Sequence, residues 1–197
     1  MRNSSRTFFH FDLDGTLADT LEVNHQAYKS AVEAADGIWT KNATELLKSG
    51  AQAQKFLLEC QNLPHMKFNE VSKIKKEYFL LNVHKIKPIV EGLELLFNAD
   101  GMAALVTNSS RPSTEAVIRF LKIEFKFSHL VTSEDVSKHK PEPDPYLLSV
   151  KIAESKFNLK LKHIAVEDSK YGLLSAKSAG LEVIKIGERF RVKNLKS

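Results

Sequence analysis

The run from Phe8 to Thr20, which reads FFHFDLDGTLADT, constrains the fold more than any other stretch. Its aromatic first part favours a buried β-strand, and Gly15 with Thr16 ends that strand. Asp12 and Asp14 therefore follow the carboxyl end of the strand, and their two-residue spacing points both side chains to the same side. Ligands of open α/β sheets bind at this end of the strands. The run predicts a binding site built on two carboxylates.

Two carboxylates held this close repel each other unless a cation or a shared proton lies between them. Carboxylate oxygens are ligands that Mg²⁺ accepts, so the pair suggests a magnesium site. An ordinary polar turn is the alternative, because Asp-Gly-Thr is also good turn chemistry. Polar groups elsewhere in the chain favour the first interpretation.

The composition limits the class of protein. With 197 residues, 43% hydrophobic and 27% charged, the chain is expected to be soluble and globular, with one domain or a core that carries an insertion. No apolar run approaches the length of a membrane span, and the basic start lacks the apolar region of a signal peptide. The single cysteine, Cys60, excludes an internal disulfide framework and fits a reducing cytosol. We expect a cytoplasmic protein with no membrane partner.

The formal net charge is +5, and five of the basic residues gather in the tail: Lys185, Arg189, Arg191, Lys193 and Lys196. A nucleic-acid partner is one interpretation. The chain shows no zinc-ligand spacing and no helix-turn-helix pattern, so a solvated tail and no nucleic-acid partner are expected. A mildly basic surface would also attract phosphorylated substrates.

Four segments after Thr16 show helical periodicity: residues 20–35, 40–49, 51–61 and 68–84. In the last of these, Val71, Ile74, Tyr78 and Leu81 recur near the helical period. No strand pattern occurs between Leu17 and Lys87. The stretch therefore predicts a helical insertion that interrupts an α/β chain.

From Pro88 on, strands and helices alternate. Strands are predicted at residues 102–107, 129–133, 163–169 and 181–187, and helices at residues 89–98, 113–122, 146–155 and 170–178. With the first strand, this order implies a parallel, doubly wound sheet with right-handed crossovers. We predict an α/β core of residues 1–17 and 88–197, with an inserted all-helical domain of residues 18–87. His10, inside the first strand, is expected in the core and not as a ligand.

Three more groups of polar side chains follow predicted strands or precede a helix. Thr107 and Asn108 end the second strand, Lys140 precedes a helix, and Glu167 with Asp168 ends the fourth strand. The motifs that contain them read DLDGT, LVTN, KPEP and VEDS in chain order. This ordered set resembles the haloacid dehalogenase-like superfamily, specifically its phosphatase and β-phosphoglucomutase branch. The resemblance covers essentially the whole chain and implies a Rossmann-like core with residues 18–87 as a helical cap.

The resemblance also implies a role for each residue. Asp12 matches the nucleophile that forms an aspartyl-phosphate, and Asp14 matches the general acid and base. The family's Mg²⁺ would be held by Asp12, the backbone carbonyl of Asp14 and Asp168, with Glu167 in or near the coordination shell.

Lys140 would neutralise the remaining negative charge and hold Asp12, while the Thr107 hydroxyl and the Asn108 backbone N–H would bind phosphoryl oxygens. Each assignment has a plain structural alternative. Lys140 could be an exposed lysine, Thr107 and Asn108 could cap a helix, and Glu167 with Asp168 could be solvated.

The leading hypothesis is a Mg²⁺-dependent phosphatase for a small phosphorylated metabolite, similar to phosphoglycolate phosphatases. The alternative is a sugar-phosphate mutase of the β-phosphoglucomutase type, and a third is a binding protein without turnover. In β-phosphoglucomutase-like members a cap glycine is followed by an arginine. Here Gly50 is present, but residues 17–87 contain no arginine. This difference favours hydrolysis.

The lysines of the same stretch include Lys48, Lys55, Lys75 and Lys76, and Lys76 loosely matches a cap lysine of the mutases. A solvated helix face is the plain alternative for them. Closure of the cap is expected to bend the chain near Ala18–Leu21 and Lys85–Gly92. We expect a monomer, with a homodimer as the alternative.

Overall fold

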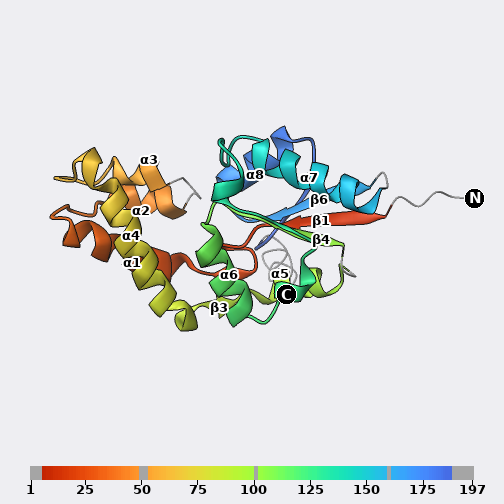
Figure 1. Cartoon of the computed structure of the whole chain (residues 1–197), viewed down its shortest axis with the longest axis horizontal. Helices are drawn as coiled ribbons and strands as arrows, with labels where there is room; N and C mark the ends of the chain where they lie inside the picture. Colours follow the sequence, from red (N-terminus) through yellow and green to blue (C-terminus); the bar gives the residue numbers. More distant parts are fainter. Residues whose placement is uncertain (1–5, 49–52, 100–101, 159–160, 188–197) are drawn as a thin grey trace, which may run out of the picture.

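A five-stranded parallel sheet forms the centre of the molecule, in the order β5-β4-β1-β6-β7. The computed structural model describes residues 6–48, 53–99, 102–158 and 161–187 (Figure 1). The strands are β1 (Thr7–Phe11), β4 (Ala103–Val106), β5 (Leu130–Val131), β6 (Lys162–Glu167) and β7 (Glu182–Lys185). This topology confirms the predicted doubly wound α/β fold, although β5 is shorter than expected.

Two helices cover each face of the sheet (Figure 1). Helices α5 (Val90–Phe97) and α6 (Arg111–Phe120) cover one face, and α7 (Asp144–Phe157) and α8 (Lys170–Ser178) cover the other. The alternation along β1 serves both layers, because Phe9 and Phe11 pack with α5 and α6 while Phe8 packs with α7. Since β1 is buried on both faces, its nearly unbroken apolar sequence is the pattern that a central parallel strand requires.

Four helices lie together at one end of the molecule (Figure 1). They are α1 (Leu21–Ala34), α2 (Lys41–Lys48), α3 (Ala53–Leu57) and α4 (Phe68–Leu81). Short 3₁₀ turns lie at His65–Lys67 (η1), Val83–Lys85 (η2), Glu124–Lys126 (η3) and Ser133–Asp135 (η4). The four helices enclose an apolar cluster of their own, which includes Phe56 and the buried Cys60. That residues 18–87 act as a separate cap remains a prediction.

The prediction that no strand lies between Leu17 and Lys87 is wrong. Strand β2 (Ala18–Asp19) pairs antiparallel with β3 (Lys87–Pro88), so the two connections to the helices run side by side. Two-residue strands are too short to show an alternating pattern. They fall within the predicted hinge segments Ala18–Leu21 and Lys85–Gly92.

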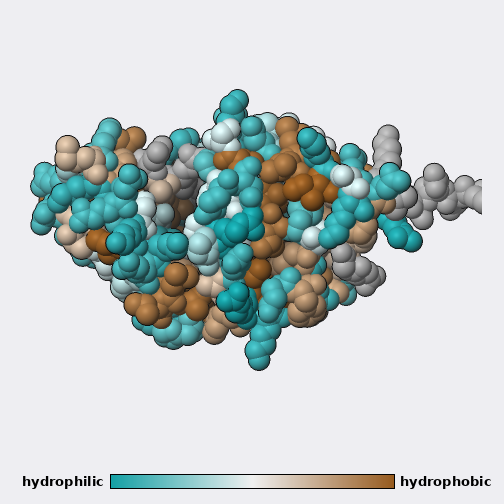
Figure 2. All heavy atoms as spheres, in the orientation of Figure 1, coloured by the Kyte–Doolittle hydropathy of each residue, from teal (hydrophilic) through white to brown (hydrophobic). Residues whose placement is uncertain are grey.

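The helical boundaries also differ from the predictions. Helix α3 ends at Leu57, and α4 ends at Leu81, where η2 replaces the expected last turn. Leu81 was expected on the buried stripe of α4, but its side chain is 77% exposed. Figure 2 shows an apolar patch near this end of α4, and a second apolar area on the same face over the part of the molecule that holds the sheet.

Two further expectations concern the surface of the chain. Within the described ranges, none of the helices combines the length and apolar character needed to cross a membrane. Of the basic tail, Lys185 ends β7, while Arg189, Arg191, Lys193 and Lys196 lie outside the described residues.

His10 lies in the core, as predicted, within a chain of hydrogen-bonded side chains against α7. Its Nδ1 is 2.8 Å from the Ser149 hydroxyl, and its Nε2 is 2.9 Å from Nδ1 of His163. The same hydroxyl is 2.9 Å from Nε2 of His129. A neutral imidazole donates one hydrogen bond and accepts one, so these contacts suit uncharged rings. Burial lowers the pKa of all three histidines, that of His129 to about 4.

We expect His129 to contribute a decrease in the free energy of unfolding as the pH is lowered from about 7 to about 4. An unfolded histidine takes up a proton near pH 6.5, whereas folded His129 does so only near pH 4. The unfolded state therefore binds more protons in this window, which costs up to about 1.4 kcal/mol per pH unit for one residue. In urea unfolding, His129→Gln should flatten this slope, and His84→Gln, at an exposed histidine, should not. Equal slopes for wild type and His129→Gln would contradict the argument.

Candidate active site

Three carboxylates meet at the carboxyl edge of the sheet. Asp12 follows β1, Glu167 ends β6, and Asp168 comes next in the chain. One oxygen of each lies within 4.8 Å of the other two. Asp12 and Glu167 are buried and Asp168 is partly buried, so the alternative of solvated acids at a strand end is wrong for Glu167. Parallel strands bring these acids together because their carboxyl ends share one edge.

Lys140 lies inside this group of acids. Its ammonium nitrogen donates hydrogen bonds to Oδ1 of Asp12 at 2.7 Å, to Oε1 of Glu167 at 2.5 Å and to the carbonyl of Val106 at 2.7 Å. The residue is 3% exposed, so the alternative of an exposed lysine is wrong. All three hydrogens of the ammonium are therefore directed to fixed oxygens.

The charges of this cluster do not balance, since one ammonium faces three carboxylates. Burial raises the pKa of Asp12, and Glu167 raises it further, against the opposing effect of Lys140. Burial and then Glu167 raise the pKa of Asp168 to about 6. Burial lowers the pKa of Lys140, but the charges of Asp12 and Glu167 more than offset it, so the lysine stays protonated. A divalent cation with oxygen ligands would fit the remaining negative charge.

Glu167 is held by four donors, two of which come from residues that sequence reasoning missed. Its Oε1 accepts the Tyr146 hydroxyl at 2.7 Å as well as Lys140. Its Oε2 accepts the Asp168 backbone N–H at 3.2 Å and the Ser169 hydroxyl at 3.3 Å. Tyr146 lies in the first turn of α7, just after the KPEP motif, which is the only sequence signal that could have indicated it.

Asp14 lies apart from the three clustered carboxylates and is surrounded by hydroxyl and amide groups. Its Oδ2 accepts the Ser109 hydroxyl at 2.7 Å and the Thr107 hydroxyl at 3.3 Å. Its Oδ1 accepts the Thr20 hydroxyl and the Asn24 amide, the latter at 3.4 Å. The carboxylates that cluster with Asp12 are therefore those of Glu167 and Asp168, and the Asp14 side chain is not part of this cluster.

Thr107 and Asn108 both contribute contacts to the site. The buried Thr107 hydroxyl lies between Asp14 and the backbone N–H of Ser109, which donates to it at 3.0 Å. The Asn108 side chain bonds the backbone of Lys140 in both directions, at 3.0 and 3.2 Å. Its own backbone N–H donates to no acceptor in the part of the chain that the structure describes. The N-cap of α6 is Ser110, so the helix-cap alternative for Thr107 and Asn108 is wrong.

The turn residues of DLDGT fix the position of the Asp168 carboxylate. Gly15 has φ of 87°, a left-handed conformation that favours glycine. A Cβ atom at this position would lie 2.1 Å from Oδ2 of Asp168, so any side chain would displace the carboxylate. The Thr16 hydroxyl donates to Oδ1 of Asp168 at 3.1 Å. The turn chemistry that was the alternative explanation of this motif therefore also serves the site.

The helices α1 and α4 bring a cation toward Asp14. The ammonium of Lys75 lies 4.8 Å from the ring centroid of Tyr28 and 4.5 Å from that of Phe79. Burial lowers the pKa of Lys75 to about 8, and the charge of Asp14 acts in the opposite direction. Lys76, which sequence reasoning singled out, is exposed. Gly50, the other residue of that argument, lies outside the described residues.

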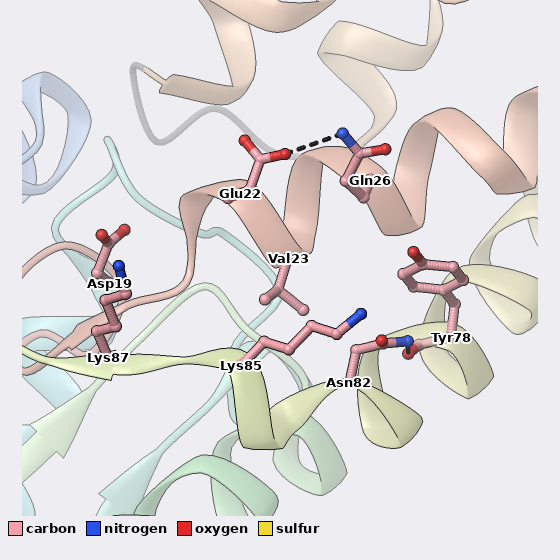
Figure 3. A pocket seen from close by; sticks show the side chains of 8 residues that line it. All are labelled: Asp19, Glu22, Val23, Gln26, Tyr78, Asn82, Lys85 and Lys87. Atoms are coloured by element: carbon pink, nitrogen blue, oxygen red, sulfur yellow. Dashed lines mark hydrogen bonds between the residues drawn. The ribbon is translucent and has the colours of Figure 1, made fainter.

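A groove of about 190 Å³ lies beside the linkers and not at the carboxylates (Figure 3). It is lined by Asp19, Glu22, Val23, Gln26, Tyr78, Asn82, Lys85 and Lys87. Thr20 and Asn24 face Asp14, whereas Glu22 and Gln26 line the groove, so it opens on the other side of α1. Both signs of charge line it, and Asp19 pairs with Lys87 across β2 and β3. We assign it no part in the chemistry.

Comparison with known proteins agrees with this geometry. Residues 10–186 match the family described as haloacid dehalogenase-like hydrolase. The chain belongs to this family. Family membership and relatives named as phosphatases make it an enzyme of the hydrolase type.

Two relatives and one structure illustrate the range within the family. The chain is 30% identical over 181 residues to a phosphorylated carbohydrates phosphatase of Thermotoga maritima, covering 88% of this chain and 82% of that protein. It is 26% identical over 196 residues to the β-phosphoglucomutase of Bacillus subtilis, covering 90% of this chain and 82% of that protein. The crystal structure of CbbY from Rhodobacter sphaeroides in complex with phosphate has a TM-score of 0.76 at 25% identity, covering 92% and 85%.

We expect Lys140→Met to destabilise the metal-free protein by about 3–5 kcal/mol, because it leaves buried carboxylates without their cation. The loss should shrink at low pH, where the carboxylates take up protons. Lys162→Met is the matched control, since its ammonium contacts Glu182 at 2.9 Å on the surface and should contribute no more than about 1 kcal/mol. Urea unfolding in EDTA at several pH values measures both. Equal losses for the two variants would contradict the prediction.

Proposed function

We propose that this enzyme is a Mg²⁺-dependent phosphatase that hydrolyses a small phosphorylated metabolite through an aspartyl-phosphate on Asp12. The observation that carries the proposal is the position of the Asp12 carboxylate. It is buried at the carboxyl edge of the sheet, 2.7 Å from the Lys140 ammonium and beside two further acids. The relatives, among them a protein named as a phosphatase of phosphorylated carbohydrates, support the substrate class.

The acid cluster fits Mg²⁺, because its donors are carboxylate oxygens and its buried charge is negative. Asp12 and Asp168 would hold the ion, with the Asp14 backbone carbonyl as a further ligand. Glu167 already accepts four hydrogen bonds and would act next to the ion. When bound, Mg²⁺ supplies positive charge that offsets the repulsion between a carboxylate and a phosphate.

Each of the remaining side chains would then have its own role in the reaction. Oδ of Asp12 forms a bond to phosphorus, and the bond between phosphorus and the leaving oxygen breaks. Asp14 gives its proton to that oxygen and later takes a proton from the water that attacks the aspartyl-phosphate, which restores Asp12. Lys140 keeps Asp12 oriented and balances charge. The Thr107 hydroxyl and the Asn108 backbone N–H would hold phosphoryl oxygens.

The helices would then form the cap that closes over the leaving group. Thr20 and Asn24 contact Asp14 from the side of the helices, and Thr107 and Ser109 contact it from the core, so the proposed general acid is bound by both parts of the chain. Lys75 is a candidate cap cation for the substrate, because the charge of Asp14 acts on its pKa. It would attract the anionic or polar end of the substrate. Paired linkers, β2 with β3, would act as the hinge.

The wild-type protein should release phosphate from one or more members of a panel of phosphorylated metabolites in the presence of Mg²⁺. EDTA should stop the release, and added Mg²⁺ should restore it. Asp12→Asn should abolish turnover with an unchanged melting temperature in Mg²⁺-free buffer to within a few degrees, because it keeps the shape and removes the nucleophile. A malachite-green assay measures the phosphate. Full activity in EDTA, or substantial activity of Asp12→Asn, would refute the mechanism.

A sugar-phosphate mutase is the second candidate, favoured by the similarity to the β-phosphoglucomutase of Bacillus subtilis. A mutase must bind a bisphosphate intermediate in two orientations, and this requires cationic side chains held in fixed positions in the cap. Residues 17–87 contain no arginine. A lysine such as Lys75 is a point charge without the bidentate fork of arginine. Hydrolysis is therefore favoured over transfer back to sugar.

Supplied with β-glucose 1-phosphate and a trace of the 1,6-bisphosphate, the enzyme should form free phosphate faster than glucose 6-phosphate. A coupled dehydrogenase assay measures the sugar phosphate, and the malachite-green assay measures phosphate in the same reaction. Faster formation of glucose 6-phosphate would refute the phosphatase proposal and support the mutase. The Asp12→Asn protein is the blank for both products.

A further inference from the structure

One side chain of the sheet layers reaches the helical end of the molecule. Tyr171, in the first turn of α8, packs against the apolar cluster of α1–α4. The ammonium of Lys55 in α3 lies 5.0 Å from the centroid of its ring, which is within the range of a cation–π contact. In Figure 1, α3 and α8 lie in the upper part of the view and β3 in the lower part. The helices thus touch the core at a place separate from the linkers.

The residues beside Tyr171 are tied to the carboxylate cluster. Ser169 caps α8 by accepting the Gly172 backbone N–H at 3.1 Å, and its hydroxyl donates to Glu167 at 3.3 Å. A Cβ atom at Gly172 would lie 2.0 Å from the Glu167 carboxylate, so helix and carboxylate are in direct contact there. Asp168 precedes this same turn. The backbone that carries Tyr171 is therefore held at a fixed position relative to Glu167 and Asp168.

The strength of this contact suits an element that has to open. A cation–π contact at an exposed site changes an equilibrium about two- to fivefold. Such a contribution cannot hold the helices in place permanently. It can shift the balance between an open and a closed arrangement, which is what repeated binding and release require.

We infer that Lys55 and Tyr171 form a latch that holds helices α1–α4 over the carboxylates, and that Tyr171 is a positioning residue. The inference rests on the proposed function, because it assumes that the helices close over a phosphorylated substrate. The latch aligns the helical part with Glu167 and Asp168 on the side away from the hinge. Breaking it lowers the closed fraction, so the apparent affinity for substrate falls by the same factor.

The test compares Tyr171→Ala, Tyr171→Phe, Lys55→Met and the double variant Tyr171→Ala with Lys55→Met. Lys73→Met, at another exposed lysine of the helical part, is the control. KM for phosphate release should rise about two- to fivefold in Lys55→Met. It should rise at least as much in Tyr171→Ala, which also loses the packing of the ring against the apolar cluster. The double variant should not exceed Tyr171→Ala, because loss of the ring already removes the contact with Lys55. Tyr171→Phe keeps the ring and should behave as wild type, and kcat should hold or increase because opening becomes easier.

An unchanged KM in both single variants, or effects that multiply in the double variant, would overturn the latch. Hydrogen exchange of α3 provides a readout that needs no turnover. Exchange should be faster in Tyr171→Ala and in Lys55→Met than in Lys73→Met, and equal rates would show that the contact does not hold the helices. If the wild type releases no phosphate from any substrate, the proposed function fails, and the exchange data alone decide on the latch.

Discussion

The buried ammonium of Lys140 is the interaction on which the rest of the site depends. Three carboxylates converge at the end of β1 and β6 because the sheet is parallel, and without a cation this convergence would be strongly unfavourable. Lys140 bonds two of them and a strand carbonyl, which fixes its position relative to β1, β4 and β6 together. Its backbone is in turn held by Asn108. One lysine therefore joins four of the predicted motifs into a single network.

One ammonium does not neutralise three carboxylates, and the negative charge that remains bears on how the site could bind a cation. The raised pKa values of Asp12 and Asp168 show that the protein alone does not stabilise all three negative charges. A site that were fully neutralised by lysines would have little affinity for a divalent cation. The ammonium thus offsets part of the buried charge, and the negative charge that remains is what the proposed Mg²⁺ would neutralise.

Much of this could be predicted from the sequence, because each of Asp12, Asp14, Thr107, Glu167 and Asp168 ends a strand with a recognisable apolar pattern. Lys140 was indicated by its motif alone. Tyr146 had no signal other than its place just after KPEP, and Ser109 had none, since their contacts depend on how α7 and the loop after β4 are rotated. The linker strands β2 and β3 were missed because two residues carry no periodicity.

Lys75 is a different case, since a signal existed. Val71, Lys75 and Phe79 are four residues apart, so they share one face of α4. The first and last are buried, and the lysine between them is directed toward Tyr28 and Asp14. The predicted stripe ran on through Ile74, Tyr78 and Leu81, of which Leu81 is exposed. Lys76 was singled out only by its resemblance to a cap lysine of the mutases. An error of one residue turns a helix position by about 100°.

The two acids of DLDGT differ in surroundings in a way that separates their roles. Asp12 lies against a fixed ammonium and is oriented by the core alone. Asp14 accepts hydrogen bonds from Thr107 and Ser109 in the core and from Thr20 and Asn24 on the side of the helices. A nucleophile has to stay in place throughout the reaction, whereas a general acid has to act only when substrate is enclosed. Because Asp14 is bound by both parts of the chain, its surroundings change whenever the helices move relative to the sheet. The position of the helices therefore affects how Asp14 is oriented, and in the proposed mechanism this would restrict proton transfer to the closed arrangement.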